Sequence, residues 1–110
     1  MDKSEDEDAA DRVFQALSSS TRRRLLDLLK NDPRTTGDLC ARIPELDRCT
    51  VMQHLKVLED AGLVVAARRG RERWNHLNVL PIVAIEKRWL GDYARPSAHL
   101  LDALAARLEA

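Results

Sequence analysis

Apolar residues recur along this chain of 110 residues with the spacing of helices that bury one face. Two such segments open the sequence, at residues 13–17 and 25–29, with a run of serines between them. Because residues i, i+3 and i+4 share one side of a helix, each segment predicts an amphipathic helix. The first is expected to begin near Glu7, and the second to use Ser20 or Thr21 as its N-cap.

A shorter helix is predicted around Leu39 and Ile43. Thr35 or Thr36 is its expected N-cap, and Pro44 marks its end because the residue before a proline disfavours helical geometry.

The next segment has the clearest helix boundaries in the chain. Asp47 is a good N-cap, and Gly62 can adopt the left-handed conformation that ends many helices. One face of the helix between them carries Val51, Leu55, Leu58 and Ala61, and the opposite face carries Cys49, Met52, Gln53 and Lys56. The first face is expected to pack on a core, and the second to face outward.

Two strand-like runs follow, at residues 63–69 and 72–78, and Gly70 lies in the turn between them. A helix pair followed by a hairpin predicts a winged helix-turn-helix, a fold that is mainly α with a small β-hairpin. Four arginines surround this turn: Arg68, Arg69, Arg71 and Arg73. Guanidinium groups are costly to bury, so we expect the tip to face solvent or a polyanion.

The last thirty residues predict two further amphipathic helices, with Pro81 in the first turn of one of them. A small domain has little surface left for them to pack on, so we expect a homodimer held by the N- and C-terminal helices. Folding back on their own domain stays open as the alternative. The candidate interface residues are Phe14, Leu17, Ile85, Trp89, Leu100, Leu101, Leu104 and Leu108.

Charge divides the chain into three parts, although the formal net charge is zero. Residues 1–11 have six acidic residues and one lysine, residues 12–76 have thirteen basic and eight acidic residues, and residues 77–110 have four of each. We therefore expect residues 1–8 to be an acidic, partly disordered lead-in, residues 9–80 a DNA-binding domain, and residues 81–110 dimerisation helices.

Arg22, Arg23 and Arg24 open the second helix, at the end where cations are unfavourable. A contact with phosphate or an acidic partner would explain this placement, and a solvated arginine face is the alternative.

Other function classes find little support in the composition. No apolar run approaches the roughly 20 residues of a membrane span, and the acidic start differs from a secretion signal, so a cytoplasmic protein is expected. The serines of residues 18–20 have no GxSxG setting, and no glycine-rich phosphate loop occurs. We therefore expect neither an enzyme nor a cofactor.

The phrases ALSSSTRRRLLDLL, TTGDLCARI and TVMQHLKVLEDAGLVVAARRGRERWNHLN closely resemble winged-helix repressors of the ArsR/SmtB family, over residues 12–80. The resemblance implies a homodimeric transcriptional repressor, with a recognition helix at residues 48–61 and a wing at residues 63–78. The family's metal-binding Cys-Val-Cys motif corresponds here to Thr35, Thr36 and Gly37. The chain thus resembles a subgroup without the metal ligands, and no metal is expected.

Double-stranded DNA is the expected partner. A dimer that places two recognition helices in successive major grooves, about 34 Å apart, predicts an inverted-repeat operator. The candidate DNA-binding residues are Arg48, Cys49, Thr50, Gln53, His54, Lys56, Arg68, Arg69, Arg71 and Arg73. Gln53 can bond adenine and Arg48 guanine, whereas the hairpin arginines suit phosphates or the minor groove. For His54, a phosphate contact and a packing role between the helices both stay open.

Two alternatives remain on the sequence alone. A winged helix can bind an acidic protein surface instead of DNA. Cys40 and Cys49 can form a thiol switch, since a helix N-terminus such as that near Cys49 favours a thiolate. Against the switch, Cys40 fits a small buried apolar position and Cys49 an exposed one.

Overall fold

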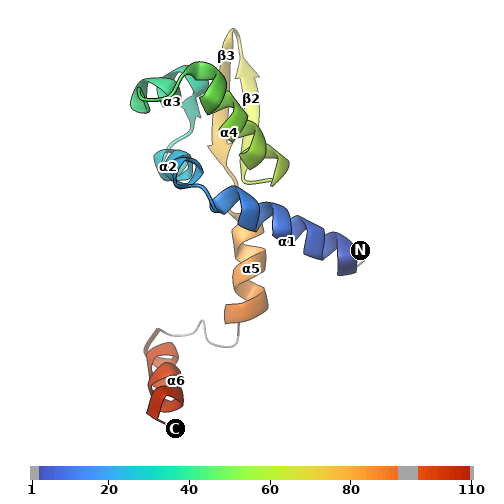
Figure 1. Ribbon diagram of the computed structural model, residues 1–110, viewed down its shortest axis with the longest axis vertical. Coiled ribbons are helices and arrows are strands. Elements are labelled where there is room, and N and C mark those ends of the chain that lie inside the picture. Colours follow the sequence, from blue (N-terminus) through green and yellow to red (C-terminus); the bar gives the residue numbers. More distant parts are fainter. Residues whose placement is uncertain (1–2, 92–96, 110) are drawn as a thin grey trace.

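The computed structural model describes the backbone of residues 3–91 and 97–109 and the side chains of residues 4–91 and 101–109. Six helices and three strands follow one another along the chain (Figure 1). They are α1 (Lys3–Leu17), α2 (Ser20–Leu29), β1 (Arg34–Thr35), α3 (Thr36–Arg42), α4 (Arg48–Asp60), β2 (Val64–Arg69), β3 (Glu72–Leu77), α5 (Leu80–Leu90) and α6 (Ser97–Glu109). The predicted winged helix-turn-helix is confirmed: α3 and α4 form the helix pair, and β2 and β3 form the wing.

The sheet has a third strand that the sequence pattern did not predict. Strand β1 pairs antiparallel with β3, with Arg34 opposite Asn75 and Thr35 opposite Trp74, so the strand order is β1-β3-β2. Two residues are too few to show a strand period, and Thr35 is also the N-cap of α3, where its side chain accepts a hydrogen bond from the Asp38 amide. The short strand joins the wing to the start of the helix pair.

One hydrophobic core lies between the first four helices and the base of the wing. Its buried members are Val13, Ala16, Leu25, Leu26, Leu29, Leu39, Ile43, Val51, Leu55, Leu58, Leu63 and Val64. The predicted inner face of α4 is confirmed, because Val51, Leu55 and Leu58 are at most 1 % exposed. Full burial of such a side chain stabilises the fold by about 1.5–3 kcal/mol, so these residues fix the orientation of α4.

Two helix starts differ from the expectations. Helix α1 begins at Lys3 instead of near Glu7, so the acidic stretch expected to be partly disordered is helical from Lys3 onward. Carboxylates in the first turn interact favourably with the helix dipole, and Ala9 and Ala10 are strong helix formers. Helix α2 is capped by Ser19, whose hydroxyl accepts from the Arg22 amide at 3.3 Å, and not by Ser20 or Thr21.

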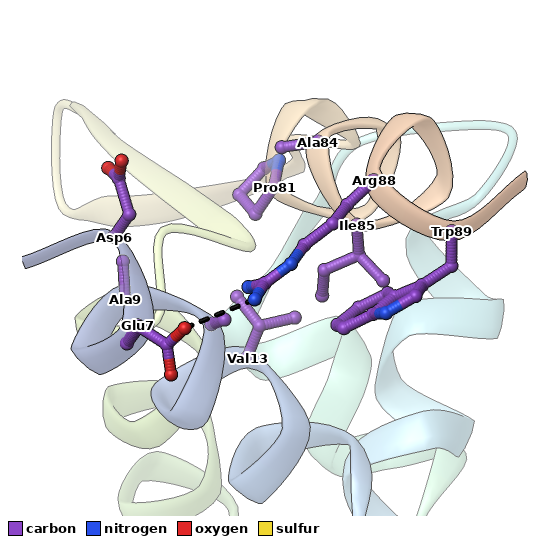
Figure 2. Close-up of a pocket in the computed structure, with 10 residues that line it drawn as sticks. Asp6, Glu7, Ala9, Val13, Pro81, Ala84, Ile85, Arg88 and Trp89 are labelled. Carbon is purple, nitrogen blue, oxygen red and sulfur yellow. Dashed lines mark hydrogen bonds and ion pairs between the residues drawn. The ribbon is translucent and has the colours of Figure 1, made fainter. Parts of the chain in front are cut away.

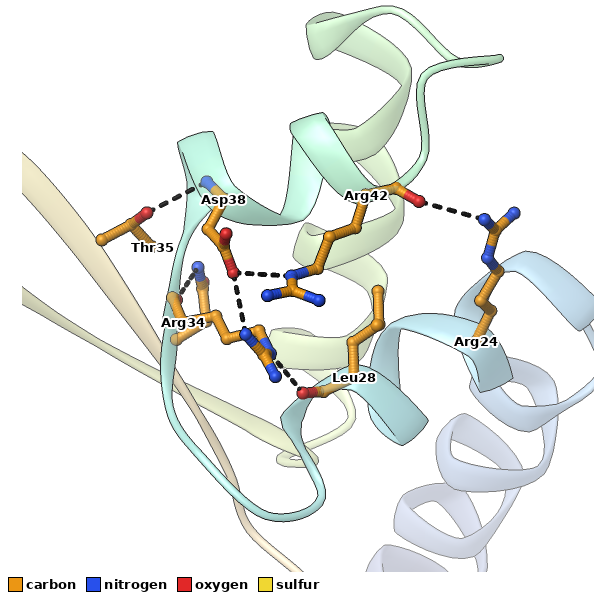
Figure 3. Close-up of polar contacts among 7 residues, drawn as sticks. Arg24, Leu28, Arg34, Thr35, Asp38 and Arg42 are labelled. Atoms are coloured by element: carbon orange, nitrogen blue, oxygen red, sulfur yellow. Dashed lines mark hydrogen bonds and ion pairs between the residues drawn. The ribbon is translucent and has the colours of Figure 1, made fainter.

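Arginine side chains cap the C-terminal ends of the first three helices. The last carbonyls of a helix have no partner within it, and cations are favourable at this end. Two of these contacts are drawn in Figure 3: Arg34 donates to the Leu28 carbonyl of α2 at 2.7 Å, and Arg24 donates to the Arg42 carbonyl of α3 at 3.0 Å. Arg34 also shares the Asp38 carboxylate with Arg42. These two arginines hold the carboxyl pKa of Asp38 below its usual value, Arg42 with the larger effect.

The arginines that open α2 therefore have internal roles. Arg23 donates to the Leu17 carbonyl of α1 at 2.7 Å, and Arg24 is also ion-paired with Glu45. Both side chains nevertheless remain exposed, as the solvated face predicted, and a contact with an external anion stays a prediction. Cations that lie unfavourably at the start of α2 lie favourably at the ends of α1 and α3.

The two C-terminal helices differ in how they contact the rest of the chain. Helix α5 packs along α1, where the rings of Phe14 and Trp89 contact each other at an angle of 47° with centroids 5.8 Å apart. Arg88 is paired with Glu7 at 3.1 Å. Helix α6 stands apart from the rest of the chain (Figure 1). It exposes Leu101, Leu104 and Leu108. Within the described ranges, no helix combines the length and the apolarity that a membrane crossing requires.

Candidate nucleic-acid interface

Helix α4 presents the polar face that the sequence predicted. Asp47 caps it by accepting from the Thr50 amide at 2.7 Å, and this hydrogen bond lowers the pKa of the Asp47 carboxyl. Gly62 ends it with a left-handed φ of 78°. The outward positions Cys49, Met52, Gln53 and Lys56 are all exposed, as is Arg48 at the first position. A row of mainly polar side chains, with Met52 among them, thus stands clear of the core from Arg48 to Lys56.

Lys56 is exposed enough to reach a phosphate. It lies 3.6 Å from Asp60 one turn later, but the Lys56 side chain is 75 % exposed. Exposed pairs of this kind contribute about 0.3–0.5 kcal/mol, so an approaching phosphate can compete for the ammonium group.

The wing carries three exposed arginines around its turn. Gly70 takes a left-handed φ of 63°, and Arg68, Arg69 and Arg71 surround it on the surface. The guanidinium of Arg69 lies 5.6 Å from the centre of the Trp74 ring, a cation–π contact that restrains the tip. One of the three exposed guanidinium groups of the wing thus lies against an aromatic ring.

Arg73 differs from these three. It lies opposite Arg68 in the strand register, but its side chain is only 29 % exposed and is ion-paired with Glu59 of α4. Its Nε is buried, with no hydrogen-bond partner among the described residues. The structure therefore does not place Arg73 with the tip arginines, and instead gives it a contact between the wing and α4.

His54 lies on the other flank of α4, toward α1 and α2. Its Nδ1 is 3.3 Å from Nη1 of Arg22. Burial lowers the pKa of His54, and the charge of Arg22 lowers it further. Of the two roles left open for His54, the structure shows the packing contact between helices.

Asn75 is a residue of this region that the sequence analysis missed. It is fully buried in β3, and its amide donates to the Thr36 hydroxyl at 3.1 Å and to the Arg34 carbonyl at 3.2 Å. These bonds tie the wing to the first turn of α3. Asparagine is disfavoured inside strands, so its presence in the predicted strand was the one sign in the sequence that this residue has a special role.

Comparisons with known proteins agree with this geometry. A family profile described as "Helix-turn-helix domain" matches residues 17–65. The uncharacterized HTH-type transcriptional regulator YuzN of Bacillus subtilis is 37% identical over 86 residues, which cover 73% of this chain and 94% of YuzN. The transcriptional repressor SdpR of Bacillus subtilis is 35% identical over 66 residues, 60% of this chain and 72% of SdpR.

Solved structures show the same arrangement. The crystal structure of the ArsR family transcriptional regulator RHA00566 has a TM-score of 0.70 and 30% identity, covering 78% of this chain and 87% of that one. The homodimeric winged helix-turn-helix DNA-binding domain of Mb0332 from Mycobacterium bovis has a TM-score of 0.60 and 26% identity, with 72% and 81% covered. The chain belongs to the ArsR family of winged helix-turn-helix transcriptional regulators. The family and the fold are those of DNA-binding regulators, not of enzymes.

Internal contacts hold in place many of the guanidinium groups of this ArsR-family chain. Six of the arginines between positions 12 and 76 are held by carbonyls or carboxylates of the chain itself: Arg22, Arg23, Arg24, Arg34, Arg42 and Arg73. The exposed cations of α4 and the wing are Arg48, Lys56, Arg68, Arg69 and Arg71. Fewer basic side chains are therefore free to move toward a phosphate than the thirteen of the sequence suggest.

Thr35, Thr36 and Gly37 occupy the positions of the ArsR-family metal motif. Thr35 is an N-cap and Thr36 is buried against Asn75. Among the described residues, no three His, Cys, Asp or Glu side chains gather closely enough to hold a metal ion. Cys40 is half-buried against the core, Cys49 is exposed on α4, and both are free thiols.

Proposed function

We propose that this ArsR-family regulator is a homodimeric repressor that binds an inverted-repeat operator, with one α4 helix in each of two successive major grooves. The observation that carries the proposal is the outward polar face of α4 beside a wing with three exposed arginines. A B-DNA major groove admits one helix, and its base edges distinguish all four base pairs. The homodimeric Mb0332 domain and the repressor SdpR support the assembly and the direction of regulation.

Each side chain at the interface has a proposed role. Arg48 and Gln53 suit base edges, because their side chains can form two hydrogen bonds to guanine and adenine respectively. Cys49, Thr50 and Lys56 lie beside them, toward bases or phosphates. Arg68, Arg69 and Arg71 suit phosphates or the minor groove, where they fix the register of the helix. We propose that Arg73 and His54 act within the protein, through Glu59 and Arg22.

Helices α1 and α5 form the first part of the proposed dimer surface. Phe14 and Trp89 are 48% and 52% exposed although their rings contact each other. A groove of about 520 Å³ lies between these helices, with Val13, Ile85 and Trp89 among its apolar walls. Figure 2 shows the side chains that line it. We propose that a second copy covers this exposed apolar surface in the dimer.

The other candidate interface residues divide into two groups. Leu101, Leu104 and Leu108 are exposed on α6 and are available to a second copy. Leu17 and Ile85 pack partly on the chain's own core, so we assign them a smaller share of the interface. The side chain of Leu100 lies outside the described residues.

The domain organisation follows from these assignments. We propose that residues 9–80 form the DNA-binding domain and residues 81–110 the dimerisation helices. The acidic residues before position 9 belong to α1 and contact α5 through Glu7 and Arg88. Because the operator lies on the chromosome, we propose the cytoplasm as the place of action, with no cofactor.

A mobility-shift experiment at two salt concentrations tests the function. The probe is the DNA upstream of the protein's own gene, and the expected result is a shift that weakens steeply with salt, because bound phosphates release counterions. The control is a duplex of the same length and scrambled sequence. No salt-sensitive shift would overturn the DNA interface and favour an acidic protein partner. Sedimentation of the same sample should give a dimer, and a monomer would overturn that part.

A further inference from the structure

One guanidinium group joins three helices behind the recognition helix. Arg22 of α2 donates from Nε to the Ala16 carbonyl at 2.8 Å and from Nη2 to the Gln15 carbonyl at 3.0 Å, both in the last turn of α1. Its Nη1 lies 3.3 Å from Nδ1 of His54 in α4. Each of the three nitrogens therefore has a different partner.

The hydrogen-bond chemistry fixes the state of His54. An arginine side chain has five N–H donors and no acceptor, so Nδ1 of His54 must accept the bond. The imidazole is then neutral, with its proton on Nε2. A charged imidazolium would place a second cation against Arg22 and would remove the acceptor.

The same contact restrains the position of the helix that carries the outward-facing residues. His54 directly follows Gln53, the centre of the outward face of α4. The rigid, planar fork of Arg22 is anchored to α1 by two bonds, so a shift of α1 is passed to His54 and from there to Gln53. A lysine at position 22 would keep the charge but would lose the fork.

We infer that Arg22 is a positioning residue for DNA recognition: through His54 it holds α4 at a fixed place relative to α1, and so sets the distance between the two recognition helices of the dimer. The inference rests on the proposed homodimer and its DNA interface. The path runs from the dimer surface at Phe14, through the last turn of α1, to Arg22, His54 and Gln53. No ligand or metal is required for it.

Two other roles for Arg22 give different measurable results. A direct phosphate contact would contribute to the salt dependence of binding, and its loss would lower the salt slope by about one unit. A purely structural role would lower the melting temperature without changing the operator spacing that the dimer prefers. A positioning role leaves the salt slope unchanged and alters the spacing preference.

The test compares Arg22→Lys with Arg23→Lys in the full chain. The two arginines are neighbours, both cap α1, and both substitutions keep the charge. Within the described residues, Arg22 bonds to His54 of α4, whereas Arg23 bonds to the Leu17 carbonyl of α1. The probe is the duplex that the unmodified protein selects from a random library. Versions with one base pair added or removed between half-sites are the comparison, and affinity is measured by fluorescence anisotropy at several salt concentrations.

We expect Arg22→Lys to weaken binding about tenfold, to leave the salt slope unchanged and to reduce the discrimination between spacings. Arg23→Lys should bind within twofold of the unmodified chain. His54→Ala should resemble Arg22→Lys, and the double variant should lose little more, because the two residues act through one contact. Thermal melts show whether each variant is folded at the temperature of the measurement.

Three outcomes would overturn the inference: equal effects of the two lysine variants, a salt slope lowered by one unit in Arg22→Lys, or an unchanged spacing preference. If Arg22→Lys fails to fold, the inference rests on His54→Ala, whose unchanged spacing preference would also overturn it. If the unmodified chain selects no duplex, the proposed function itself is wrong, and the positioning role falls with it. Failure of the inference and failure of the function are therefore distinguishable.

Discussion

Glu59 of the recognition helix is ion-paired with Arg73 of the wing, and both side chains are 29 % exposed. The pair connects the recognition helix α4 to the wing, the two elements proposed to contact DNA. Partial burial makes it stronger than a surface pair, but removing one partner leaves the other charge poorly solvated. The wing therefore depends on an acidic residue for its position, although its outer surface is basic.

The contrast between Arg73 and Arg71 predicts opposite effects of alanine substitution. Arg71→Ala should lower the salt slope of DNA binding by about one unit and leave stability unchanged, because Arg71 is an exposed phosphate candidate. Arg73→Ala should destabilise the fold by about 1 kcal/mol and leave the slope nearly unchanged. Urea unfolding and anisotropy titrations measure both. The assignment fails if the two variants behave alike.

Asn75→Ala should destabilise the fold by about 1–3 kcal/mol, because it removes two hydrogen bonds and leaves the buried Thr36 hydroxyl without its donor. Chemical denaturation with urea gives this value. Asn31→Ala, an exposed asparagine in the turn before β1, is the matched control and should change stability by less than about 0.5 kcal/mol. Equal effects of the two substitutions would contradict the role of Asn75.

Acidification should weaken the fold through His54. Its pKa in the folded protein lies below the usual 6.5, by burial and by Arg22, so the unfolded chain takes up a proton first. The stabilising contribution is complete above pH 6.5 and is lost as the pH falls from there toward the folded pKa. Unfolding curves between pH 8 and 5 measure it. His54→Gln should flatten this part of the profile, and a profile unchanged by His54→Gln would refute the assignment.

Leu104→Glu should convert the dimer to a monomer, because it places a charge on the leucine stripe of α6. Ala106→Glu is the matched control, since it lies on the opposite side of the same helix and should leave the dimer intact. Analytical ultracentrifugation over a range of concentrations distinguishes the two. A Leu104→Glu chain that remains dimeric would exclude α6 from the interface.

The sequence allowed the prediction of those elements whose signals are local. The boundaries of α4 follow from Asp47 and Gly62, its buried face follows from the period of its leucines, and the wing follows from two strand-like runs around Gly70. Each of these signals lies within a few residues of the feature that it determines. The structure confirms them nearly residue by residue.

The misses concern contacts between residues far apart in the sequence. Arg22 meets His54 across 32 positions, Asn75 meets Thr36 across 39, and β1 pairs with a strand some 40 positions later. The spacing of hydrophobic residues along the sequence carries no information about such long-range contacts. An arginine that binds a helix end also looks the same in sequence as one that binds a phosphate, and only the fold separates them.

The arginine caps have a consequence for how the regulator searches a chromosome. Non-specific affinity for DNA grows with the number of phosphates that a protein neutralises. With six guanidinium groups committed to the chain itself, fewer cations remain to hold random sequence. The protein should therefore leave wrong sites quickly, and its residence at the operator should depend on the base contacts of α4. Occupancy in a cell is then governed by competition among very many sites, where rapid release is an advantage.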